Sequence, residues 1–188
     1  MRRVSQLILR CFGWEIVGQL PNLNKYIIIV GPHTSNWDFV IGILVRSALA
    51  ADIRFLGKHQ LFNFPFGWFF RAIGGVPVYR NKDNALVEQV VTMFNSRERF
   101  VIGLAPEGTR RNITRWRSGF YHIAHHAKID IVMVGIDFSA KEIILNAPMT
   151  PCGDIDQDFP IILDYFRTVT GRFAKEIPAH QPVTKIER

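Results

Sequence analysis

The sequence lacks several features that mark common classes of protein. Only two of its 188 residues are cysteines, Cys11 and Cys152, and they lie far apart, so neither a disulfide framework nor a thiolate zinc site is expected. No uncharged apolar run reaches the roughly 18 to 20 residues that span a bilayer. The chain also contains no GxGxxG, GxxxxGKS/T or GxSxG signature, which argues against dinucleotide-binding, P-loop and serine-hydrolase functions.

The composition is that of an ordered globular protein with an anionic partner. Hydrophobic residues make up 48% of the chain and charged residues 21%, which is enough apolar side chain for a core and too little charge for disorder. The length predicts a single domain over residues 1–188. The formal net charge of +7 favours phosphate esters, acidic phospholipid or nucleic acid as partners, without choosing among them.

Short apolar, β-branched runs alternate with segments of helical periodicity. Strands are predicted at 26–30, 53–57, 76–78, 100–105, 131–136 and 141–146. Helices are predicted at 36–50, from 81 or 83 to 94, at 118–127, and over 162–173, where Ile162, Phe166, Val169 and Phe173 form one buried stripe. Because parallel strands need crossover connections, this order predicts an α/β fold with a mixed, mainly parallel sheet flanked by helices.

Residues 1–20 predict an amphipathic helix with two interpretations. Apolar side chains recur there at spacings of three and four residues, with Arg2, Arg3 and Arg10 between them. The helix either packs on the core or lies in the plane of a membrane, with the arginines at the headgroups and Trp14 at the boundary. The segment has no continuous apolar stretch of the kind that a secretory signal needs.

Residues 62–70 contain six phenylalanines and tryptophans, interrupted by Pro65 and Gly67. These rings could line an acyl groove or dip into a lipid surface between Lys58 and Arg71. The alternative is a helix packed into the core, and we favour it for at least half of the rings because clustered apolar residues usually face inward.

A first candidate site lies in the loop that follows the strand 26–30. In α/β folds, loops at the carboxyl ends of strands carry the functional residues. His33 and Asp38 are five positions apart across a bend, so the carboxylate can accept from one imidazole nitrogen and leave the other as a base. No nucleophile accompanies them, which points to a hydroxyl from the substrate. Taken alone, the two residues are better interpreted as an exposed loop histidine and an aspartate that the helix macrodipole favours near a helix N-terminus.

A second candidate site follows the strand 100–105. Gly108 permits a tight turn with exposed N–H groups, Thr109 adds a hydroxyl donor, and Arg110 has the planar fork that matches phosphate. Glu107 is expected to hold an arginine or a substrate hydroxyl. The alternative is a capped polar turn on a solvated basic face. Arg80, which ends the segment GGVPVYR, means little by itself.

The order HTSNWD, GGVPVYR, PEGTR resembles the glycerophospholipid acyltransferase family, which includes the 1-acyl-glycerol-3-phosphate acyltransferases. His33, Ser35 and Asp38 match the family's H-x-S-x-x-D motif, and residues 107–110 match its E-G-T-R motif. Arg80 matches the arginine that ends a further motif. The resemblance covers roughly residues 24–140. The segment IVMVGIDF lacks the proline around which the family's fourth motif is built.

The resemblance implies a glycerolphosphate acyltransferase-like fold and an acyl transfer from acyl-CoA or acyl-carrier protein to a hydroxyl of a lysophospholipid such as 1-acyl-glycerol-3-phosphate. His33 and Asp38 would be catalytic. The implied substrate-binding residues are Ser35, Arg80, Glu107, Gly108, Thr109 and Arg110. No cofactor and no metal is implied beyond the acyl donor as co-substrate. The expected location is cytoplasmic, peripheral on the inner face of the membrane, with the membrane surface as a partner and no nucleic acid.

Other functions stay open at this stage. The chain could acylate a different lipid acceptor or be a non-catalytic lipid-binding protein. It could also bind nucleic acid through a basic cluster with a stacking ring, composed of Arg110, Arg111, Arg115, Trp116 and Arg117. That function gives no reason for the histidine and aspartate in the first loop. His122, His125 and His126 are interpreted as ordinary surface histidines of a helix.

Overall fold

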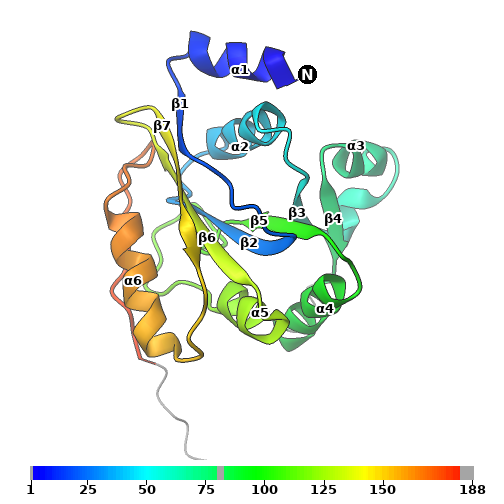
Figure 1. Ribbon diagram of the computed structural model, residues 1–188, viewed down its shortest axis with the longest axis vertical. Coiled ribbons are helices and arrows are strands. Elements are labelled where there is room, and N and C mark those ends of the chain that lie inside the picture. Colours follow the sequence, from blue (N-terminus) through cyan, green and yellow to red (C-terminus); the bar gives the residue numbers. More distant parts are fainter. Residues whose placement is uncertain (1, 80–82, 183–188) are drawn as a thin grey trace, which may run out of the picture.

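The computed structural model describes residues 2–79 and 83–182 and contains one seven-stranded sheet (Figure 1). The strands lie in the order β1-β7-β6-β2-β5-β3-β4. Their bounds are β1 Glu15–Gly18, β2 Lys25–Gly31, β3 Ile53–Lys58, β4 Gly75–Val78, β5 Phe100–Leu104, β6 Asp130–Asp137 and β7 Glu142–Met149. All neighbouring strands are parallel except β6 and β7, which are antiparallel. The predicted mixed, mainly parallel α/β fold is therefore confirmed.

Helices cover both faces of this sheet. They are α1 Arg2–Cys11, α2 Trp37–Ala48, α3 Gly67–Ala72, α4 Asp83–Asn95, α5 Gly119–Ala127 and α6 Ile155–Arg167, with a 3₁₀ helix, η1, at His59–Phe62. In Figure 1, α1 and α2 lie on one side of the sheet, whereas α4 and α5 lie on the other. α3 lies beside the edge strand β4.

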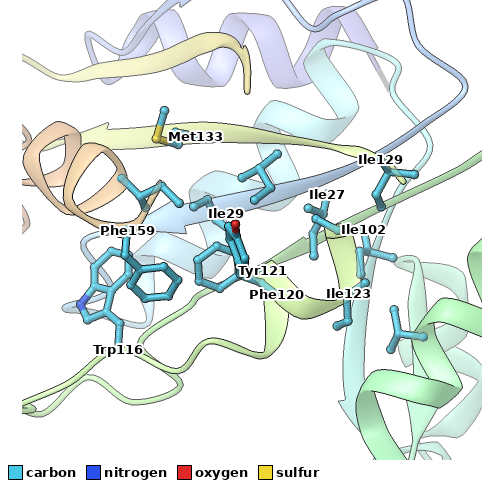
Figure 2. Close-up of a cluster of buried hydrophobic side chains, with 14 of the residues drawn as sticks. Ile27, Ile29, Ile102, Trp116, Phe120, Tyr121, Ile123, Ile129, Met133 and Phe159 are labelled. Carbon is cyan, nitrogen blue, oxygen red and sulfur yellow. The ribbon is translucent and has the colours of Figure 1, made fainter. Parts of the chain in front are cut away.

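The central strand β2 shows why two cores form. Its side chains alternate: Ile27 and Ile29 belong to the core beneath α4, α5 and α6, whereas Tyr26 and Ile28 belong to the core beneath α1 and α2. Such a strand is apolar on both faces, as a strand covered on both sides must be. Figure 2 shows the first core, in which rings gather against β2; they belong to Trp116, Phe120, Tyr121 and Phe159.

Six predicted strands are present within a few residues of their expected bounds, but the expected helix over residues 1–20 is wrong in its second half. α1 ends at Cys11, and Gly13, with φ of +76°, starts a turn into β1. β1 then pairs in parallel with β7. The sequence signal for this strand is weak because β1 has only four residues and lies at the sheet edge.

The final helix also differs from its prediction. α6 begins at residue 155, capped by the side chain of Asp154, and ends at Arg167. Ile162 and Phe166 are buried as expected, but Phe173 lies beyond the helix and is 61% exposed. The apolar spacing continues past the helix end because Val169, two residues beyond α6, is also buried and packs against Gly135 of β6.

The first helix packs on the core along one face, as one of the two interpretations predicts, and exposes its other face. One face packs on α2: Ser5 Oγ donates to Ser47 Oγ at 2.8 Å, and Leu9 is buried. Val4 and Leu7 on the other face are about three-fifths exposed, at 60% and 61%. Of the described helices, none is both long enough and apolar enough to cross a bilayer.

The aromatic segment contradicts the favoured interpretation. Phe62 is buried, but Phe64, Phe66 and Trp68 are 98%, 67% and 72% exposed. η1 and α3 are only four and six residues long, so they offer one inward position for Phe62 and cannot bury rings on every side. Phe69 is also exposed.

Candidate active site

The two candidate sites meet at one edge of the sheet. β2 and β5 are parallel neighbours, with Ile29 opposite Leu104, so the loops that follow them leave the sheet side by side. This edge is where parallel α/β sheets present functional residues. The proximity of the two loops thus follows from the strand order.

His33 and Asp38 contact each other as predicted. Nδ1 of His33 lies 2.9 Å from Oδ2 of Asp38, and the same oxygen accepts the backbone N–H groups of Thr34 and Ser35, each at 2.8 Å. A carboxylate oxygen in such a contact accepts, so Nδ1 of His33 carries the hydrogen that it donates to Asp38. Nε2, on the far side of the ring, then keeps its lone pair and can act as a base.

Ser35 shapes this loop and does not reach the cavity. Its Oγ accepts the backbone N–H of Trp37 at 3.1 Å, and the residue is buried. This bond satisfies one of the free donors at the start of α2. The expected contact between Ser35 and substrate stays a prediction.

Glu107 is also engaged by the protein itself. Its Oε1 accepts the backbone N–H of His33 at 2.7 Å, and its Oε2 forms an ion pair with Lys175. The residue is only 1% exposed. Glu107 therefore joins the two loops and pairs with a lysine; its expected contact with a substrate hydroxyl stays a prediction.

The rest of the second loop is polar and tightly turned. Gly108 has φ of +66°, and a β-carbon there would lie 3.2 Å from Nε of Arg117. Thr109 Oγ1 accepts the N–H of Arg111, and Arg110 donates to Oδ1 of Asn36 at 2.7 Å. Arg110 thereby ties the second loop to the first and keeps further N–H donors.

Arg80, which the sequence also assigns to substrate binding, lies outside the described residues. Its expected role as a second phosphate ligand stays a prediction.

A cavity of about 970 Å³ opens beside His33. Of the candidate site residues that the structure describes, His33, Asp38 and Gly108 line it, whereas Thr109 and Arg110 do not. Its walls are mainly apolar and come from α2, the sheet and α5; they include Phe39, Ile41, Val45, Phe55, Leu104 and Ile123. The space has the size of a site that encloses a ligand, and its lining suits a hydrocarbon chain.

Arginines dominate the charge of this cavity. Asp38 is the single acidic residue among the described lining residues. Arg46 and Arg54 also line it, but both pair with Asp52. Arg115 and Arg117, also in the lining, form no ion pair with a described carboxylate.

From the sequence alone, Arg115 and Arg117 belong to the basic cluster of the nucleic-acid alternative and have no expected part in the acyltransferase site. The tight turn at Gly108 brings Arg117 next to the second loop, a relationship that spacing alone does not reveal. The nucleic-acid alternative loses its stacking ring at the same place, because Trp116 is only 3% exposed and packs in the core. A buried ring cannot stack on a base.

His122 on α5 also lines the cavity. Burial lowers the pKa of His122, and repulsion from His126 and His125 lowers it further. Within residues 2–79 and 83–182, no three His, Cys, Asp or Glu side chains are arranged to hold a metal ion. The ring is thus favoured in its neutral form at the wall of the cavity.

Comparison with known proteins identifies relatives of one kind. The 1-acyl-sn-glycerol-3-phosphate acyltransferase of Streptococcus pneumoniae is 29% identical over 118 residues, which are 62% of this chain and 43% of that protein. The enzyme of that name from Escherichia coli is 29% identical over 126 residues, covering 63% of this chain and 50% of its own length. The match thus spans about half the length of these relatives.

The fold has a solved counterpart. The crystal structure of the 1-acyl-sn-glycerophosphate acyltransferase of Thermotoga maritima aligns with a TM-score of 0.59 and 12% identity, over 89% of this chain and 75% of the other. The sequence model of the family described as Acyltransferase matches residues 15–137, which include both loops and the strands that carry them. By this match, the chain belongs to the acyltransferase family.

Proposed function

We propose that this protein transfers a fatty acyl group from a thioester, acyl-CoA or acyl-carrier protein, to a hydroxyl of 1-acyl-glycerol-3-phosphate or a related lysophospholipid. The observation that carries the proposal is the contact between His33 and Asp38 at the wall of a large apolar cavity. A base without a neighbouring nucleophile suits a reaction in which the substrate supplies the hydroxyl. The names of the relatives supply the acceptor.

The reaction needs one proton to move twice. Nε2 of His33 removes the proton of the acceptor hydroxyl as its oxygen attacks the thioester carbonyl carbon. The tetrahedral intermediate collapses, the carbon–sulfur bond breaks, and the thiolate takes the proton from the imidazolium. Asp38 stabilises that imidazolium and fixes the ring orientation. No covalent acyl-enzyme forms.

Two parts of the cavity match the two parts of such a lipid. The apolar wall from α2 and the sheet accommodates an acyl chain. The guanidinium of Arg117, beside Gly108, binds the acceptor phosphate in the cavity, whereas Arg110, which does not line the cavity, keeps further N–H donors in the same loop. Gly108 allows the phosphate close to the backbone because it has no side chain.

The exposed rings indicate how the protein reaches lipid substrate. Phe64, Phe66 and Trp68 are exposed in a segment that Lys58 and Arg71 flank in the sequence, and α1 presents Val4 and Leu7 between arginines of its sequence. Aromatic side chains flanked by cations are typical of surfaces that enter the headgroup region of an anionic bilayer. We therefore include peripheral membrane binding in the proposed function.

The test is a product assay on the full chain. Purified protein is incubated with a mixture of lysophospholipids and acyl-CoA or acyl-carrier protein, and products are identified by mass. Diacylated glycerol phosphate, formed by the wild type and absent with His33→Ala, is the expected result. Acylation of a different lipid by the same histidine would move the proposal to another acceptor, and transfer that survives His33→Ala would overturn it.

A further inference from the structure

The segment that follows α6 enters the site from the far end of the chain. It lies beyond residue 137, where the match to the family model stops. Within it, the side chain of Lys175 is 2% exposed. Its Nζ donates to the backbone carbonyls of His33 at 3.0 Å and Thr109 at 2.9 Å and forms the ion pair with Glu107.

These contacts close a ring around the backbone of His33. The N–H of His33 donates to Oε1 of Glu107, Oε2 of Glu107 contacts Lys175, and Lys175 donates back to the carbonyl of His33. Both backbone polar groups of the proposed base are therefore held by one buried ion pair. The bond to Thr109 connects the same ammonium to the second loop.

A lysine suits this position because an ammonium group has three N–H donors and meets three acceptors here. Its charge compensates the enclosed carboxylate of Glu107, and loss of one partner would leave an unpaired buried charge. Exchange for a neutral side chain also frees two carbonyl groups, one in each loop.

Neighbouring contacts seat the segment before it reaches Lys175. Thr34 follows His33 in the sequence, and its Oγ1 accepts the N–H of Arg172 at 3.0 Å. A β-carbon on Gly171 would lie 2.6 Å from Cγ2 of Thr34, so the backbone of this segment packs directly against the first loop. The first loop is thus held by this segment at two successive residues.

We propose that Lys175 is a positioning residue for acyl transfer, which sets the place of His33 and of the second loop through the Glu107–Lys175 pair. The inference rests on the proposed function. It assigns part of the site to a segment outside the family match. A displacement of a catalytic group by about 1 Å can cost roughly 10²-fold in rate, which gives the pair its importance.

The first experiment separates position from charge balance. Lys175→Met is expected to lower kcat roughly 10²-fold and to change KM for the acceptor less than about threefold. The double variant Glu107→Gln/Lys175→Met keeps an oxygen for the N–H of His33 and removes the unpaired charge, so its melting temperature should recover while kcat stays low. Lys128→Met is the control with unchanged kcat, because Lys128 precedes β6 and therefore lies at the amino ends of the parallel strands, opposite the two loops.

Near wild-type kcat in Lys175→Met would overturn the proposal. So would recovery of kcat together with melting temperature in the double variant, because the lysine would then serve only to neutralise Glu107.

A second readout needs no acyl transfer. Lysyl endopeptidase can cut after Lys175 only when that side chain leaves its buried position. Glu107→Gln should speed cleavage at this site at least about tenfold over wild type, and equal rates would overturn the link between the pair and the segment. If wild type makes no acylated product, the proposed function fails, whereas the cleavage rates still decide whether this pair holds the two loops.

Discussion

Oδ2 of Asp38 lies 2.9 Å from Nδ1 of His33 and also accepts the N–H groups of Thr34 and Ser35. One oxygen therefore shapes the backbone of the loop and orients the ring that the loop carries. Because those backbone bonds keep the carboxylate in place, the imidazole is oriented before any substrate binds. Such preorganisation lowers the cost of reaching the transition state.

Removal of either member of this pair should abolish most of the acyl transfer. We expect His33→Ala and Asp38→Asn each to lower kcat roughly 10²- to 10⁴-fold, the range that general base catalysis supplies. Asparagine keeps an acceptor oxygen but loses the charge that stabilises the imidazolium. The measurement is thioester consumption at saturating substrate, with melting temperature to confirm folding. A rate within about threefold of wild type for either variant contradicts the assignment.

Substitution of Arg117 should weaken binding of the phosphorylated acceptor and leave the rate of the acyl-transfer step nearly unchanged. A charge-assisted hydrogen bond contributes about 1.5–3 kcal/mol, so Arg117→Met is expected to lower kcat/KM roughly 10- to 150-fold, mainly through KM for the phosphorylated acceptor. Arg111→Met is the control, since Arg111 belongs to the same basic loop but does not line the cavity among the described residues. Equal losses in both variants would mean that only the overall positive charge matters.

A glycine in α2 offers a way to shorten the cavity. Gly42 lines it, and a β-carbon there would meet no heavy atom within 4 Å outside its own helix. Gly42→Phe should fill part of the cavity and shift the preferred acyl donor to shorter chains. Gly42→Ala, the control, should keep chain preference and raise the free energy of unfolding by about 0.5–1 kcal/mol, because glycine is unfavourable within a helix. An unchanged chain-length profile in Gly42→Phe would place the acyl chain elsewhere.

The contact between His33 and Asp38 and the mainly parallel sheet could be predicted because they depend on local signals. The run 26–30 is apolar at every position, and a residue spacing that crosses a strand-to-helix bend brings His33 back to Asp38. Both features are properties of a few consecutive residues. The strands β2 and β5 then bring the two loops together, which the α/β pattern also implies.

The remaining parts of the site depend on contacts between distant segments. Nothing near Lys175 in the sequence marks it as a partner of Glu107, and burial of the pair depends on how the chain returns after α6. Glu107 and Ser35 were given substrate contacts because polar residues in a motif suggest ligands, yet both satisfy the protein's own backbone. The exposure of the rings at 64–68 could not be predicted, because the local composition does not show that the helices formed here are too short to bury them.

The exposed rings beside α3 should control binding to lipid. Phe64→Ser combined with Trp68→Ser is expected to reduce cosedimentation with anionic phospholipid vesicles at least about tenfold, because each ring contributes a few kcal/mol when it leaves water. The melting temperature should change little, since both rings are exposed. The control is Phe173→Ser, an exposed ring in the segment after α6. Loss of binding in the control alone would assign the lipid contact to that segment.

The carboxylate of Asp137 should make the free energy of unfolding depend on pH in the acidic range. Burial by itself raises the pKa of Asp137, but hydrogen bonds from Ala140, Ser139 and Thr170 outweigh it and hold the pKa below its ordinary value. The unfolded chain therefore binds more protons below about pH 3.9, so this stabilisation is complete above that pH and is lost as pH falls through the folded-state pKa. Asp137→Asn should lower the free energy of unfolding by about 1–3 kcal/mol at neutral pH, since the amide NH2 of asparagine cannot accept the N–H of Thr170.

Urea titrations at a series of pH values would measure this difference. The gap between wild type and Asp137→Asn should stay constant from about pH 7 to 5 and shrink below about pH 4, where the wild-type carboxylate becomes protonated. Asp164→Asn is the control, because Asp164 is exposed and pairs only at the surface with Arg167, so its effect should stay within about 1 kcal/mol. A gap that widens on acidification would have the wrong sign for a carboxylate stabilised in its ionised form.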